Sequence, residues 1–132
     1  MTDIDPLKIT SQIVEAFESV KTAWEKAKEE QELCDHEYND LTHGLELIKF
    51  NACEGYKLAK QLQNNRIRRR KAKNTLEQLK PLYDVFKKHQ GFLRELKKAQ
   101  AEIATTYDIQ QKRIYTPRVR TDLQEALEKN RG

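Results

Sequence analysis

Mostly apolar side chains recur along the first third of the chain in alternating steps of four and three residues. This spacing is the a and d pattern of a heptad repeat, which keeps one stripe of a helix facing a partner helix. The stripe consists of Ile13, Phe17, Val20, Trp24, Ala27, Gln31, Cys34, Tyr38, Leu41, Leu45 and Ile48. Asp5 before Pro6 suits a helix start, because its carboxylate can cap the helix and proline fits the first helical position. We therefore predict a helix over residues 5–49.

A second stripe with the same spacing follows a short interruption. It consists of Leu58, Leu62, Asn65, Arg69, Ala72, Leu76, Leu79, Tyr83 and Phe86. Asn51 and Glu54 resemble a capping box at the start of a new helix, so the chain turns just before them. We predict a second helix over 52–90, kinked at Pro81 because proline removes one backbone hydrogen bond.

Two stripes on either side of a short turn predict an antiparallel hairpin of the coiled-coil type. Folding the chain about the turn places opposite each other residues whose numbers add up to about 103. This register sets Trp24 against Leu79. It also sets Phe17 against Phe86 near the open end.

The remainder of the chain predicts two shorter helices. A third helix covers 92–112, with a stripe formed by Phe92, Leu96, Ala99 and Ile103. Thr121 and Gln124 have the spacing of a capping box, which predicts a small C-terminal helix over 122–129. The predicted fold is therefore all-α, a long helical hairpin plus a third helix and a small C-terminal helix.

Composition agrees with one helical domain over residues 1–132. Only 4 glycines and 3 prolines accompany a 35% content of charged residues, which suits long solvated helices and not a many-stranded sheet. At 1.5 Å per residue, the first helix would extend roughly 60 Å, longer than a compact domain of this size. We therefore expect a partner along the rod, with a homodimer as the favoured arrangement.

The same features predict a cytoplasmic protein. No apolar run approaches the length of roughly 20 residues that crosses a bilayer. The first five residues lack the basic start and apolar stretch of a signal peptide. Cys34 and Cys53 are the only cysteines, and two free thiols fit a reducing compartment.

Basic residues occupy six of the eight positions from Arg66 to Lys73, against a formal net charge of only +4. Arginine forks suit phosphate or carboxylate, so this run can form a site for an anion. The alternative is a set of ion pairs within the hairpin, because the register brings an acidic stretch alongside. That stretch contains Glu29, Glu30, Glu32, Asp35, Glu37 and Asp40. The structural interpretation is the commoner outcome for such helices.

Arg69 lies on the predicted seam and must find an acid or a ligand there, since an unpaired buried charge costs several kcal/mol. Either a polar layer with Asp35, Tyr38 and Asn65 fixes the register, or Arg69 and Arg66 grip a phosphate or carboxylate. Both interpretations stay open. The candidate ligand- or partner-binding residues are Arg66, Arg68, Arg69, Arg70, Lys73, Tyr38 and Asn65.

Other chemistry finds little support in the chain. His36, Asp40 and His43 share a helix face, but the heptad places that face in solvent, so we expect no metal. No phosphate loop or nucleophile motif is present, and we expect no cofactor and no catalytic residue. No motif for reading duplex DNA is evident. A general nucleic-acid contact can involve Tyr107, Arg113, Tyr115, Arg118 and Arg120.

The stretch from Leu41 to Leu82 resembles uncharacterised small helical proteins encoded by phages and prophages of Gram-positive bacteria. The segments that carry the resemblance are Leu45–Leu47, Glu54–Ala59 and Arg66–Arg70. It covers about a third of the chain. It implies an accessory protein in the host cytoplasm that binds host machinery, for example a component of a defence system, or that sequesters a signalling nucleotide.

We therefore expect a non-catalytic helical protein that binds and blocks a host protein. The alternative is an anion-binding module for nucleic acid or a signalling nucleotide, built on the Arg66–Arg70 run. Salt separates the two, because phosphate binding weakens steeply as salt rises and an apolar contact responds little.

Overall fold

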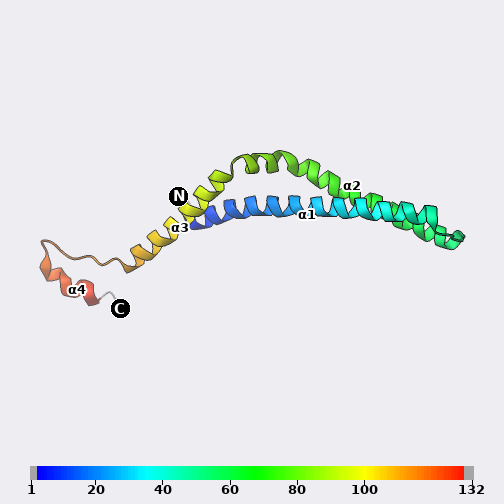
Figure 1. The fold of residues 1–132 in the computed structure, drawn as a ribbon. Helices are drawn as coiled ribbons and strands as arrows, with labels where there is room; N and C mark the ends of the chain where they lie inside the picture. Colours follow the sequence, from blue (N-terminus) through cyan, green and yellow to red (C-terminus); the bar gives the residue numbers. More distant parts are fainter. Residues whose placement is uncertain (1–2, 130–132) are drawn as a thin grey trace.

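A computed structural model describes residues 3–129, and Figure 1 shows an elongated, all-helical chain. Helix α1 spans Pro6–Leu47, α2 spans Ala52–Lys88 and α3 spans Gln90–Lys112. A 3-10 turn, η1 (Thr121–Leu123), leads into α4 (Gln124–Lys129). Met1 and Thr2, two of the five N-terminal residues compared above with a signal peptide, lie outside the described residues. None of the described helices is long and apolar enough to pass through a membrane.

Helices α1 and α2 pack antiparallel along most of their length, so the predicted hairpin is confirmed (Figure 1). Asp5 Oδ1 accepts hydrogen bonds from the backbone N–H groups of Leu7 and Lys8, as a helix cap requires. Asn51 Oδ1 accepts from the Glu54 N–H at 2.9 Å, and Asn51 Nδ2 donates to Glu54 Oε1 at 3.2 Å. Both predicted caps therefore begin their helices.

The helix register agrees with the heptad alignment at the open end and shifts slightly beyond it. The rings of Phe17 and Phe86 stack with centroids 3.8 Å apart, as predicted. Trp24 stacks at 4.3 Å on Tyr83, one helical turn beyond the Leu79 that the alignment sets opposite it. Farther along the hairpin, the most buried seam residues are Ala27, Cys34, Asn65 and Ala72.

Helix α2 continues through Pro81 without ending there. Figure 1 shows α2 arching away from α1 in the part that contains this proline, which agrees with the expected bend. The helix ends at Lys88, and His89, with φ −113° and ψ 38°, separates it from α3. The boundary thus precedes the predicted one by two residues, because Gly91 is itself helical.

Helix α3 packs against the first turns of α1. Gln100 Nε2 donates to Ser11 Oγ at 2.7 Å, and Lys97 forms an ion pair with Glu18 at 3.2 Å. Thr10 and Val14 on α1 are buried. In Figure 1 the second half of α3 extends past the start of α1, so the two ends of the molecule differ in shape.

The C-terminal helix starts differently from the prediction. Thr121 opens the 3-10 turn η1, whose start has no side-chain cap, so the expected capping box with Gln124 does not form. Arg120 instead makes two hydrogen bonds, at 2.9 and 2.8 Å, to the Asp122 carboxylate. This pairing occupies the first turn and lowers the pKa of Asp122. Figure 1 shows α4 away from the hairpin.

Candidate functional site

A polar layer crosses the middle of the hairpin at Asn65, whose side chain is fully buried. Asn65 Nδ2 donates to the carbonyl oxygen of Cys34 on α1 at 2.9 Å. Asn65 Oδ1 accepts from Arg66 Nε at 3.1 Å and from a terminal nitrogen of the same guanidinium at 2.8 Å. The Arg66 guanidinium in turn lies 3.9 Å from the centre of the Tyr38 ring. Three predicted site residues thus come together, and they bond to one another.

The next residues of the basic run form ion pairs across the hairpin. Arg68 lies 2.8 Å from Glu30 and 3.2 Å from Glu37, so one guanidinium bridges two carboxylates of α1. Hydrogen bonding to Glu30 is the main cause that raises the pKa of Arg68. Arg69 pairs with Asp35 at 2.8 Å. The interpretation of the run as cross-helix ion pairs is therefore confirmed for these two arginines.

The other candidate residues of the basic run form no ion pair across the described part of the hairpin. Arg70 and Lys73 form no ion pair among the described residues, and Arg70 is exposed. Arg66, Arg69 and Arg70 line one shallow hollow of about 380 Å³. Arg68 lines a different hollow, between α1 and α2. The structure therefore distributes the predicted anion-binding residues over two hollows and does not gather them into one pocket.

Replacing Arg68 with alanine is expected to lower the midpoint of thermal unfolding, because Glu30 and Glu37 would lose their shared cation. The loss should shrink as salt rises, since these half-exposed charges are screened. Arg70→Ala is the matched control and should leave the midpoint unchanged. Unfolding followed by circular dichroism at low and high salt measures both. Equal midpoints for the two variants would show that the bridge adds nothing to stability.

The two cysteines differ in environment. Cys34 is fully buried and its thiol donates to Glu30 Oε1 at 3.7 Å, whereas Cys53 is exposed. Burial raises the pKa of the Cys34 thiol, which keeps it protonated and unreactive. In the part of the chain that the structure describes, no group of histidine, cysteine and carboxylate side chains is placed to hold a metal.

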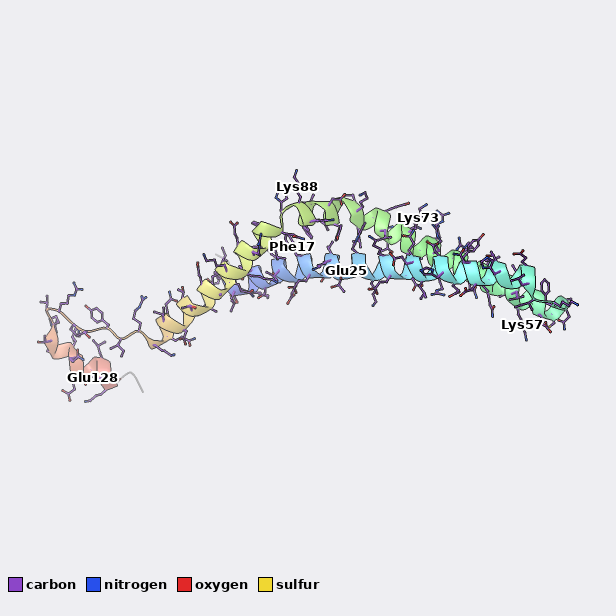
Figure 2. The ribbon with its side chains drawn as sticks, in the orientation of Figure 1. Phe17, Glu25, Lys57, Lys73, Lys88 and Glu128 are labelled. Atoms are coloured by element: carbon purple, nitrogen blue, oxygen red, sulfur yellow. The ribbon has the colours of Figure 1, made fainter. Side chains whose placement is uncertain are left out.

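A cluster that the sequence reasoning missed lies at the closed end of the hairpin, which Lys57 marks in Figure 2. Its members are Leu47, Ile48, Phe50 and Tyr56, with exposed fractions of 77, 56, 44 and 68%. We call these four residues the tip cluster. The heptad stripe had assigned Ile48 to the seam, but α1 ends at Leu47 and Ile48 is extended. The sequence signal was available, since four large apolar residues fall within ten positions around the turn.

Phe50 is held at the tip by the first turn of α2. A methyl group added at Gly55 would lie only 3.0 Å from Phe50 Cδ2, so the ring rests against the bare glycine backbone. Phe50 immediately precedes the cap residue Asn51, and Gly55 is the fourth residue of α2. A hydrophobic staple uses these two positions, but glycine has no side chain, so the contact here is between the Phe50 ring and the backbone. The glycine therefore makes room for the ring at the turn.

The aromatic and basic residues near the C-terminus do not form a common surface with the basic run. Tyr107 lies on α3 and lines a hollow with Pro6 at the start of α1. Tyr115 is exposed on the segment between α3 and η1, and Arg120 is paired with Asp122.

Two candidate surfaces thus lie on the hairpin: the basic run in its middle and the tip cluster at its closed end. No protein-family model matches the chain, and neither the curated proteins nor the solved structures contain a match.

Proposed function

We propose that this chain is a non-catalytic helical protein that binds another protein through the tip cluster. The observation that carries the proposal is the exposure of four large apolar side chains at one end of a long hairpin. Single apolar residues are ordinary on a protein surface, whereas a contiguous group of them marks a contact site. An apolar centre is also what gives a protein interface most of its binding energy.

The arm behind the tip supports this role. Asn65, Arg68 and Arg69 bond from α2 to α1 in the middle of the hairpin, so the two helices are joined at several points. At the turn itself, the Phe50 ring rests against the Gly55 backbone. A preorganised surface loses less conformational entropy on binding, so a small apolar tip can reach useful affinity.

The partner class follows from the resemblance of residues 41–82 to phage and prophage proteins, because the tip cluster lies within that stretch. On this basis the partner is a host protein, such as a defence-system component, and docking of the hairpin blocks it. The mechanism requires no chemical step, only occupation of a surface that the host protein needs.

A second candidate function is anion binding, and the position of Arg70 favours it. This residue is exposed, forms no ion pair among the described residues and lines a hollow with Arg66 and Arg69. The contacts of Arg68 with Glu30 and Glu37 argue against it, because they neutralise the centre of the run. Tip docking is therefore the better supported proposal.

The test compares capture of partners by three affinity-tagged forms of the full chain in host-cell extract. The forms are the wild type, a tip variant with Leu47, Ile48 and Tyr56 changed to serine, and a control with Ile67, Leu82 and Val85 changed to serine. All six positions carry exposed apolar side chains. The tip variant should recover at least about tenfold less partner, whereas the control should match the wild type.

Two outcomes would count against tip docking. Undiminished capture by the folded tip variant would place the contact elsewhere on the chain. Loss of the captured material on nuclease treatment or at high salt would favour the anion-binding candidate, since phosphate contacts are strongly salt-dependent. Circular dichroism of each variant checks that the hairpin is intact.

A further inference from the structure

An open hollow of about 650 Å³ lies between α1 and α2 on one side of the hairpin, away from the tip cluster. Three alanines line this hollow, and their short side chains leave the space open. Ala27 and Ala72 are almost fully buried, and Ala23 is half-buried. Leu33 borders the same hollow, yet 53% of it is exposed. One surface therefore carries both a hollow floored by methyl groups and an unpartnered leucine.

We propose that this surface pairs with the same surface of a second copy of the chain. In a two-fold dimer the contact is reciprocal, so the face must contain both the inserting group and its receptor. Leu33 supplies the first and the alanine-lined hollow supplies the second. An antiparallel pairing of two α1 helices centred near Glu30 sets Leu33 of each copy opposite Ala27 of the other.

The charges around the hollow permit such a pairing. Lys26, Glu29 and Lys71 line it, and none of them belongs to an ion pair within the described chain. The rim thus offers unpaired charges of both signs to an identical surface. Glu30, near the two-fold axis, lies 2.8 Å from Arg68, which neutralises it. Glu29 lies one residue from the axis and is unpaired within the described chain, so the pairing requires Lys26 or Lys71 of the other copy to neutralise it.

The chain exposes enough surface to bury part of it in a dimer. The structure exposes 11028 Å². A compact monomer of 15.6 kDa exposes only about 7,200 Å². The C-terminal segment accounts for part of the difference of about 3,800 Å². Obligate dimers bury roughly 2,000–5,000 Å² shared between both chains, which the rest of the excess can supply.

Light scattering coupled to gel filtration tests the pairing on the full chain. The wild type should have twice the mass of 15.6 kDa. Leu33→Asp should raise the dissociation constant by about 100-fold or more, because it places a charge in an apolar hollow. Ile67→Asp is the matched control: Ile67 is also exposed, at 60%, and lines a different hollow, so its dimer should persist. Ala23→Phe fills the hollow from the end of the α1 wall opposite Leu33 and should weaken the dimer as well.

Cross-linking locates the contact independently of stability. In a Cys53→Ser background, copies carrying Leu33→Cys are mixed under oxidising conditions with copies carrying Lys26→Cys, and a disulfide between unlike copies is expected. Lys26 is exposed in the hollow and neighbours Ala27, which the pairing sets opposite Leu33. A monomer at every concentration would overturn the proposal. So would a dimer that both Leu33→Asp and Ala23→Phe leave intact, because pairing would then use another face. None of these results bears on the tip cluster, whose capture experiment stands separately.

Discussion

Replacing Asn65 with alanine is expected to lower the free energy of unfolding by about 2–3 kcal/mol. The side chain is fully buried, so alanine leaves a cavity and removes the donor to the Cys34 carbonyl. The Arg66 guanidinium also loses both of its bonds to Asn65 Oδ1. Urea unfolding followed by circular dichroism measures the change.

Asn64→Ala is the matched control for this substitution. Asn64 is the neighbouring asparagine on the same helix but is exposed, so its change should stay within about 0.5 kcal/mol. If both variants unfold at the same urea concentration, the polar layer does not stabilise the hairpin. The Asn65 contacts would then contribute nothing measurable to the free energy of unfolding.

Replacing Asn65 with leucine separates stability from specificity. Leucine fills most of the space, so stability should recover relative to alanine, but the bond that ties α2 to Cys34 is gone. A single polar residue on a heptad seam sets register at a cost in stability. Distances between spin labels on α1 and α2 should therefore broaden or shift in Asn65→Leu. An unchanged, narrow distance would mean that the apolar seam alone sets the register.

Replacing Phe17 with alanine is expected to lower the free energy of unfolding by about 2–3 kcal/mol. It should also release α3 from α1. Phe17 stacks on Phe86 of α2 at 3.8 Å and lies 6.2 Å from the Phe92 ring of α3, so one side chain connects three helices. Figure 2 labels it where α2 and α3 meet over α1. In Phe17→Ala, amide hydrogen exchange in α3 should be faster than in the wild type, whereas the amides in the middle of the α1–α2 hairpin should stay protected.

Leu82→Ala provides the comparison for Phe17→Ala. Leu82 is a large apolar residue of α2 in the same region but 44% exposed, so its removal should change stability little. Protection of α3 that is the same in both variants would show that Gln100–Ser11 and Lys97–Glu18 suffice to hold α3.

Local signals explain why much of the hairpin was predictable. Asp5 and Asn51 cap helices through bonds to residues two or three positions away, so short sequence windows contain the necessary information. The stacking of Phe17 on Phe86 follows from counting heptads outward from the turn. Asn65 and Arg69 interrupt an otherwise apolar stripe, which indicated either a polar layer or an anion pocket; the contacts of Asn65 and Arg69 with α1 correspond to the polar layer.

Other predictions failed where competing local interactions decided the outcome. Thr121 and Gln124 have capping-box spacing, but Arg120 pairs with Asp122 and the helix opens with a 3-10 turn. The second helix was expected to reach residue 90, yet it ends at Lys88 and His89 forms the break. The heptad alignment also did not indicate that Trp24 stacks on Tyr83, one helical turn from Leu79. The spacing of residue types along the chain does not indicate which of two competing contacts forms.

The sequence by itself determined the helices, the turn at Asn51 and which stripe of each helix is buried, because these depend on periodicity and on contacts between near neighbours. Only the tertiary structure decided how the arginines divide between two hollows and which apolar residues remain exposed at the tip. It also decided that α3 continues past the start of α1. These features depend on where one helix ends relative to another and on which side chain reaches a shared partner first, which a repeat of residue types does not encode.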